Sequence, residues 1–106
     1  MEEKELYWVA GLLEGEGCFY TTSDGVYPRV SVGSTDRDIL VRLRDTTGIG
    51  LIGNPRAKST SLGSKLMYMW QVTKREDAIN LMEAVYPIMG ERRQMKIREI
   101  IGEKVA

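Results

Sequence analysis

The sequence contains no histidine and only one cysteine, Cys18. Without histidine the chain cannot form a Ser-His-Asp or Cys-His triad, a zinc site with histidine ligands, or a histidine-based nuclease centre. A single cysteine excludes a disulfide within the chain and is typical of a reducing compartment. Any metal ion held by this chain must therefore be bound by oxygen atoms, which favours Mg²⁺, Ca²⁺ or Mn²⁺.

Long apolar runs are also missing. At 106 residues the chain is expected to form one domain, residues 1–106, around a single modest core. The first apolar run follows Glu2, Glu3 and Glu5, which is the wrong charge for a signal peptide. Glutamates interrupt this run well short of the ~20 apolar residues that span a bilayer. We therefore expect an intracellular protein, in the cytoplasm or an organelle matrix, with no membrane contact.

The net charge of the chain is zero, but this is an average over segments of different charge. Fifteen basic and fifteen acidic residues cancel, which alone gives no indication of a nucleic-acid partner. Residues 1–24 hold six acids and one base, and residues 76–106 hold six acids and five bases. Residues 25–75 hold nine bases and three acids, a net charge of +6. The middle of the chain is therefore basic.

The most informative pattern that is present lies in residues 7–19. An apolar helical run carries Gly11 and Gly15, each of which costs about 1 kcal/mol relative to alanine inside a helix. Glycines four apart leave one helix face bare, so that another helix can approach closely. Glu14 and Glu16 follow as the helix ends. Two interpretations stay open here: ordinary packing with solvated acids, or contact between copies with a cation bound by the acid.

Apolar periodicity predicts an alternation of helices and strands. Helices are expected over residues 4–14, 36–46, 76–86 and 91–103, and strands over residues 18–22, 27–32, 49–54 and 66–73. A turn is expected at residues 23–25. Two hairpins joined by a helix predict an α+β fold with a four-stranded antiparallel sheet, whose apolar face is covered by the helices.

The other face of this sheet is expected to be polar and open. In the second strand, for example, Arg29 and Ser31 alternate with Val30 and Val32. A β-ribbon can read base edges in a duplex groove while basic residues hold the phosphates. The pattern does not show which of residues 51–54 face DNA. The candidate DNA-binding residues are Tyr20, Thr22, Arg29, Ser31, Arg56, Lys58, Lys65, Gln71 and Thr73.

Residues 9–17, Val-Ala-Gly-Leu-Leu-Glu-Gly-Glu-Gly, resemble the motif of the LAGLIDADG homing endonucleases. The resemblance extends along nearly the whole chain, because the element order, residues 36–40 and 47–50, and the Tyr68-x-Trp70-x-Val72 pattern are also similar to the family's. It implies the αββαββα fold with one further helix, in which a saddle-shaped four-stranded sheet carries its helices on one face.

The resemblance also implies an assembly and a metal site. The family's motif helices pack side by side about a two-fold axis, which would place Val9, Gly11, Leu12 and Gly15 at a dimer interface. One motif per chain implies a homodimer and a near-palindromic DNA target. The last acid of the motif, Glu16, is implied as the catalytic metal ligand, with the Gly15 carbonyl beside it. The implied metal is Mg²⁺, for which Mn²⁺ or Ca²⁺ could substitute in binding.

The function implied is site-specific cleavage of double-stranded DNA. The family commonly supports the transition state with a basic residue near the last helix, for which Arg92, Arg93 and Lys74 are candidates. It often has a polar residue near the end of the second strand, where this chain has residues 32–34, Val-Gly-Ser. That departure motivates an alternative, a non-cleaving DNA-binding or maturase-like RNA-splicing protein. A plain dimerisation module with solvated acids is a third interpretation.

Overall fold

A computed structural model describes residues 1–57 and 66–102 of the chain. The helices in this part are α1 (Glu3–Glu16), α2 (Arg37–Thr47), α3 (Arg75–Val85) and α4 (Glu91–Ile101), and a short 3₁₀ turn, η1 (Tyr86–Ile88), separates the last two. The strands are β1 (Gly17–Thr21), β2 (Pro28–Ser34), β3 (Leu51–Ile52), β4 (Arg56–Ala57) and β5 (Leu66–Val72). None of the helices described has the length and apolarity needed to cross a membrane.

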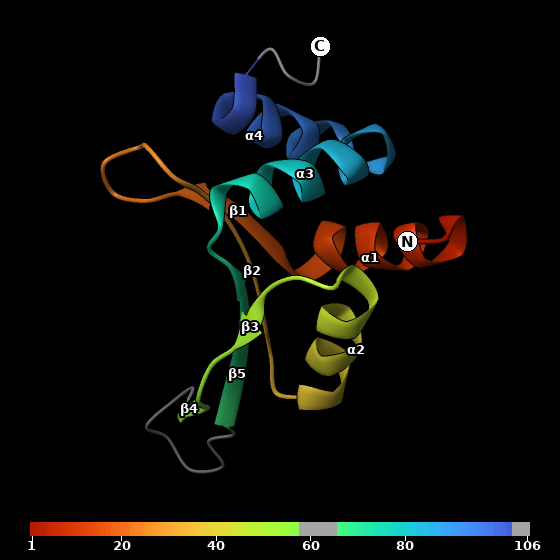
Figure 1. Ribbon diagram of the computed structural model, residues 1–106, viewed down its shortest axis with the longest axis vertical. Coiled ribbons are helices and arrows are strands. Elements are labelled where there is room, and N and C mark those ends of the chain that lie inside the picture. The colour runs from red at the N-terminus through yellow and green to blue at the C-terminus, as the bar shows by residue number, and fades with distance from the viewer. Residues whose placement is uncertain (58–65, 103–106) are drawn as a thin grey trace.

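The strands form one antiparallel arrangement. β1 pairs with β2, β2 with β5, and β5 with β3, so that the order is β1-β2-β5-β3, while β4 also pairs with β5. Figure 1 shows α1 and α2 on one side of β2 and β5, with none of the described helices on the other side of these two strands. The predicted α+β fold, an antiparallel sheet with its helices on one face, is confirmed.

The core lies between the helices and the covered face of the sheet. Alternate residues of β2 and β5 supply this face, namely Val30, Val32, Trp70 and Val72, all of which are buried. The helices contribute Val9, Leu13, Leu40, Leu43, Met82, Val85 and Ile97, among others. The indole N–H of Trp70 donates a hydrogen bond to the carbonyl of Ile49 at 3.1 Å. This bond holds the chain before β3 against the sheet.

The third predicted strand is shorter than expected. It was predicted over residues 49–54, but β3 is confined to Leu51 and Ile52 before the chain reaches Pro55. Proline has no N–H for a ladder hydrogen bond, which accounts for an interruption at this point. Pairing with β5 places Leu51 opposite Gln71 and leaves its side chain 75% exposed. Ile52 packs against the core, so Leu51 is the residue of β3 on the open face.

The predicted turn at residues 23–25 joins β1 to β2. The Asp24 carboxylate accepts hydrogen bonds from the Thr22 hydroxyl at 2.5 Å and from the Val26 N–H at 3.1 Å. Both bonds lower the pKa of Asp24, and the bond from Thr22 has the larger effect. The Thr22 oxygen also accepts from the Tyr27 N–H at 3.2 Å. Thr22 was predicted to contact DNA, but this hydroxyl both donates and accepts inside the turn.

Two neighbouring glycines allow a test of how tightly Trp70 fixes this region. Gly48 and Gly50 both have positive φ, 71° and 85°. A Cβ on Gly50 would lie 2.3 Å from Trp70 Nε1, whereas one on Gly48 would meet nothing within 4 Å. We predict that Gly48→Ala lowers the free energy of unfolding by about 1–2 kcal/mol, the cost of left-handed backbone. Gly50→Ala should cost roughly a further 1–3 kcal/mol because the indole must move. Equal losses in urea denaturation would contradict this contact.

Candidate metal centre and nucleic-acid interface

Helix α1 has two opposite faces. Val9 and Leu13 are fully buried in the core, whereas Gly11 and Gly15 are exposed and lie on the opposite side at 3.6 residues per turn. A Cβ on either glycine would meet nothing within 4 Å. Packing within the described chain therefore requires neither glycine. Val9 was predicted at a dimer interface, but its side chain faces the chain's own core because it shares the helix face of Leu13.

The exposed side of α1 is apolar around these glycines. We call Tyr7, Gly11, Leu12 and Gly15 the glycine face; Tyr7 is 54% exposed and Leu12 is half-buried at the edge. Trp8 borders this face, and the Arg42 guanidinium of α2 lies 4.0 Å from the centroid of its ring. Such a cation–π contact holds the two helices together. The exposed glycines thus lie beside Trp8, which Arg42 supports, and Tyr7, which is exposed.

The two glutamates that end α1 have different surroundings. Glu14 accepts a hydrogen bond from the Gly90 N–H at 2.6 Å, and its other oxygen lies 3.7 Å from Arg93 Nε. Glu16 is exposed, and no residue that the structure describes forms a hydrogen bond or salt bridge with it. Residues 1–57 and 66–102 also contain no group of three or more acidic or cysteine side chains that could hold a metal ion. One chain thus offers one free carboxylate here.

Arg93 joins the end of α1 to β1 and α4. Its Nη1 donates to the Gly17 carbonyl at 2.7 Å, and its guanidinium lies 5.9 Å from the centre of the Phe19 ring. Its Nε is buried without a hydrogen bond within the described chain, so the 3.7 Å approach to Glu14 is an ion pair only. Gly17 directly follows Glu16. Arg93, predicted as a catalytic candidate, is therefore bonded to the residue that follows Glu16, and its catalytic role stays a prediction.

The other two basic candidates lie in different places. Arg92 is exposed on α4 and lines, with Cys18, a hollow beside β1. Gly17, the first residue of β1, lies in the same row of the sheet as Trp70 of β5. Lys74 lies four residues beyond Trp70. β5 ends at Val72 and Lys74 immediately precedes α3. Arg92 is thus placed beside β1, and Lys74 lies beyond the end of β5 that is away from the Gly17 row.

The open face of the sheet is ordered in rows. One row crosses all four main strands and contains Cys18, Ser31, Gln71 and Leu51. Ser31 is only 8% exposed, because it is a short side chain on a central strand. Within this surface the Gln71 Nε2 donates a hydrogen bond to the hydroxyl of Tyr20 at 3.1 Å. The predicted residues Tyr20, Ser31 and Gln71 are therefore brought together on one face.

The remaining DNA-binding candidates are less uniform. Arg29, opposite Tyr20 on β2, donates through Nη1 to the Thr73 carbonyl at 2.8 Å. It therefore ties β2 to the end of β5 while staying at the surface. The backbone of Arg56 lies in β4, opposite Met67. Lys58 and Lys65 lie outside the described residues.

Near the end of β2, where the resemblance implies a polar residue, Gly33 has apolar neighbours. Gly33 pairs with Met69, and a Cβ on Gly33 would lie 3.3 Å from Met69 Cε and 3.4 Å from Met67 Sδ. Both methionines lie on the open face, as the alternation of β5 predicts, and Met69 is 39% exposed. Two thioether side chains thus occupy the position at which a polar group would orient water.

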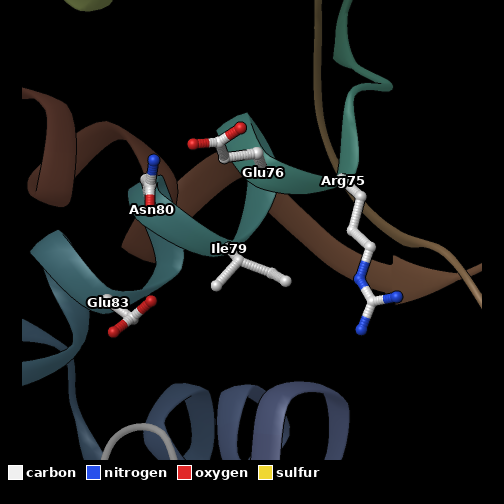
Figure 2. A pocket seen from close by; sticks show the side chains of 5 residues that line it. All are labelled: Arg75, Glu76, Ile79, Asn80 and Glu83. Atoms are coloured by element: carbon white, nitrogen blue, oxygen red, sulfur yellow. The ribbon is translucent and has the colours of Figure 1, made fainter.

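A separate hollow lies along α3. It is lined by Arg75, Glu76, Ile79, Asn80 and Glu83. Figure 2 shows Ile79 directed toward α4, with the charged side chains around it. It contains none of the residues predicted to bind metal or DNA, and it mixes one cation with two carboxylates. We therefore assign the candidate site to the end of α1 and the open face of the sheet.

The positioning role of Arg93 can be tested against its neighbour. The Arg93 side chain is 13% exposed, and Arg93→Met would leave the Gly17 carbonyl without its donor and Glu14 without its ion-pair partner. We predict a loss of about 1–3 kcal/mol in the free energy of unfolding. Arg92→Met, at an exposed position on the same helix, should stay within about 0.5 kcal/mol of the parent. If urea denaturation shows the same change for both variants, Arg93 does not clamp the end of α1.

No protein-family model matches the sequence, and no curated protein is significantly similar to it. Solved structures do match. The archaeal intron-encoded homing endonuclease I-Vdi141I, complexed with DNA, has a TM-score of 0.66 and 20% identity, over 93% of this chain and 67% of that one. I-CvuI, in complex with the I-CreI target and 2 mM Mg with the DNA not cleaved, has a TM-score of 0.65 and 20% identity, over 97% of this chain and 68% of that one.

The group I intron-encoded homing endonuclease I-CeuI, complexed with DNA, has a TM-score of 0.65 and 15% identity, over 93% of this chain and 53% of that one. The chain thus spans from about half to about two thirds of these three proteins. At such identities the likeness establishes the fold, and it agrees with the motif at residues 9–17 and with the order of helices and strands. The chain has the LAGLIDADG homing-endonuclease fold.

Proposed function

We propose that this chain is a site-specific endonuclease for double-stranded DNA that acts as a homodimer with Mg²⁺ bound by Glu16. One observation carries the proposal. The free carboxylate of Glu16 stands at the end of a helix whose exposed face holds two glycines with nothing packed on them. A metal ligand and a contact surface are thus adjacent on one element.

The glycine face supports the dimer. Together Gly11 and Gly15 cost the isolated helix about 2 kcal/mol relative to alanine. Because nothing in residues 1–57 and 66–102 lies within 4 Å of a Cβ at either position, packing within this part of one copy does not offset the cost. A second α1 laid across the face would bury apolar side chains and approach the bare backbone closely. Contact at Gly15, one residue before Glu16, would bring the two Glu16 side chains of the dimer together.

The donor set at this end of α1 fits a hard divalent cation. The Glu16 carboxylate is accompanied by the carbonyl of Gly15, which belongs to the last four residues of the helix, whose carbonyls have no partner within it. These are oxygen ligands of the kind that Mg²⁺ prefers, and Mn²⁺ or Ca²⁺ could substitute in binding. When bound, such a cation lowers the pKa of water and neutralises charge on the scissile phosphate.

Electrostatics favour a cation at this place. Helix C-termini carry partial negative charge, and two carboxylates brought together there repel each other unless a cation lies between them. Glu14 does not add to this repulsion in the same way, because Gly90 and Arg93 already satisfy it. Arg92, exposed near the start of β1, is the cation we propose for stabilising the charge that develops on the phosphate.

The open face supports DNA as the substrate. Residues 25–75, which include β2, β3 and β5, carry a net charge of +6. Three of the bases in this segment, Arg37, Arg42 and Arg44, belong to α2 on the other side of the sheet. Arg29 lies on β2 at the surface and can attract a phosphate, while the Tyr20 and Gln71 side chains offer hydrogen-bonding groups to bases. I-Vdi141I and I-CeuI, which share the fold, are complexed with DNA. A two-fold dimer of this face would read a near-palindromic target.

One observation favours a second candidate function. Met67 and Met69 cover Gly33, where the resemblance implies a polar side chain that positions water. A protein that binds DNA, or structured intron RNA as a maturase does, without cutting would need no such residue. The two candidates share the dimer and the open face, and they differ only in what happens at Glu16.

Cleavage separates the two. Incubated with Mg²⁺ and a duplex library of random sequence, the parent protein should cut a subset of sequences. Glu16→Gln should lower that rate by roughly 10²-fold or more while gel-shift binding in Ca²⁺ persists. Glu3→Gln, an exposed acid at the other end of α1, is the matched control and should cut normally. Binding without cleavage by the parent, in Mg²⁺ and in Mn²⁺, would establish the second candidate instead.

The dimer is tested by two substitutions at Gly11, one read out by stability and the other by sedimentation. Gly11→Ala should raise the stability of the monomer by up to about 1 kcal/mol, because alanine favours helix and meets nothing there. Gly11→Leu should fold equally well yet sediment as a monomer, since its side chain would hold a second helix away. Glu83→Leu, on the exposed side of α3 (Figure 2), should leave the sedimentation unchanged. A Gly11→Leu protein that sediments as a dimer would overturn the glycine face as the interface.

A further inference from the structure

The open face holds one amide in a fixed orientation. Gln71 of β5 donates through Nε2 to the hydroxyl of Tyr20 of β1 at 3.1 Å. Because Gln71 pairs with Ser31 and Tyr20 pairs with Arg29, this bond crosses the intervening strand β2. Gln71 is nevertheless exposed. A long polar side chain is thus held by a neighbour and still presents its end to the partner of this face.

The hydrogen bond leaves a defined pair of groups for recognition. An amide has two N–H donors and one carbonyl acceptor, and Tyr20 takes one donor of Gln71. The part of the chain that the structure describes supplies no other hydrogen bond to this side chain. One N–H donor and the carbonyl acceptor of this amide therefore remain for a partner at the surface.

That pair matches one base in the major groove. Adenine presents an acceptor, N7, beside a donor, its N6 amino group. Guanine presents two acceptors and cytosine a single donor, so neither can pair with both groups of the amide. A glutamine oriented in this way is therefore a reader of adenine.

The neighbour of Gln71 across the sheet completes the match. Leu51 of β3 is the register partner of Gln71, and its side chain is 75% exposed on the same face. Strands in a sheet lie about 4.8 Å apart, so the two residues are neighbours across the sheet, with the Gln71 amide directed toward β1 and Leu51 on the opposite side of β5. In an A·T pair the thymine methyl group lies at the far end of the edge that begins with adenine N7. An apolar side chain next to an adenine reader is therefore placed for that methyl group.

We infer that Gln71, held by Tyr20, reads an adenine and that Leu51 contacts the methyl group of the thymine paired with it. The inference rests on the proposed function, because it assigns this face to the major groove of DNA. It goes further in naming one base pair of the target and the two side chains that select it. By two-fold symmetry the same pair recurs in the other half of the target.

The test is a binding selection in Ca²⁺ from a random duplex library. The parent should select an A·T pair at one position of each half-site by roughly 5- to 100-fold over the other pairs. Gln71→Ala should lose the preference at that position and keep the preferences elsewhere. Tyr20→Phe, which removes only the hydroxyl, should weaken the same preference with little change in overall affinity. Asn80→Ala, an exposed amide on α3 (Figure 2), is the matched control and should change nothing.

The methyl contact has its own test. Replacing the selected thymine by deoxyuridine removes the methyl group and should weaken binding by the parent by roughly 3- to 5-fold. Leu51→Ala should bind the two duplexes equally well. A preference that survives Gln71→Ala, or a deoxyuridine effect that survives Leu51→Ala, would overturn the inference. DNA binding with no A·T preference would overturn it and leave the proposed function standing, whereas the absence of salt-dependent DNA binding would remove both.

Discussion

The constraint on which this structure depends is that α1 buries one face and leaves the opposite face bare. Val9 and Leu13 bind the helix to the core, and that fixes which way Gly11 and Gly15 point. Arg93 then holds the carbonyl of Gly17, just past the end of the helix, and Glu14 is held by the start of α4. Together these contacts hold the residues on both sides of Glu16, Glu14 and Gly17. The proposed dimer and the proposed metal site are two uses of that one orientation.

Strand β5, like α1, has one buried face and one exposed face. Trp70 lies in the core and Gln71, its neighbour, on the open face, so a single strand connects core packing with the surface proposed to read bases. The indole of Trp70 also bonds the Ile49 carbonyl and leaves no room for a side chain at Gly50. These contacts hold the entry to β3, which places Leu51 beside Gln71. Specificity in the proposed DNA complex would thus depend on a buried residue that never touches DNA.

The sequence predicts what depends on local pattern. The motif, the helices and the alternation of β2 and β5 all follow from residues near one another in the chain. The clamp at the end of α1 does not, because Glu14 with Gly90 and Gly17 with Arg93 join positions 76 residues apart. The register of β3 is set by pairing with β5, and its own few residues carry no indication of it. The turn hydrogen bonds of Thr22 and the place of Lys74 beyond the end of β5 could not be predicted for the same reason, since both depend on the folded chain.

Binding and cutting are separable in this architecture. In the proposed complex, recognition would use Tyr20, Gln71 and Leu51 on the open face and association would use the glycine face, so neither would need the carboxylate of Glu16. Met67 and Met69 lie beside Gly33 near the end of β2, whose last residue is Ser34. The proposed cleavage would therefore have no side chain at Gly33 to orient a nucleophile, and it would rely on Glu16 and the Gly15 carbonyl as ligands of the cation and on Arg92 beside the phosphate. A change at Gly33 would then be expected to alter cleavage while the fold, the dimer and the reading of the target stay as they are.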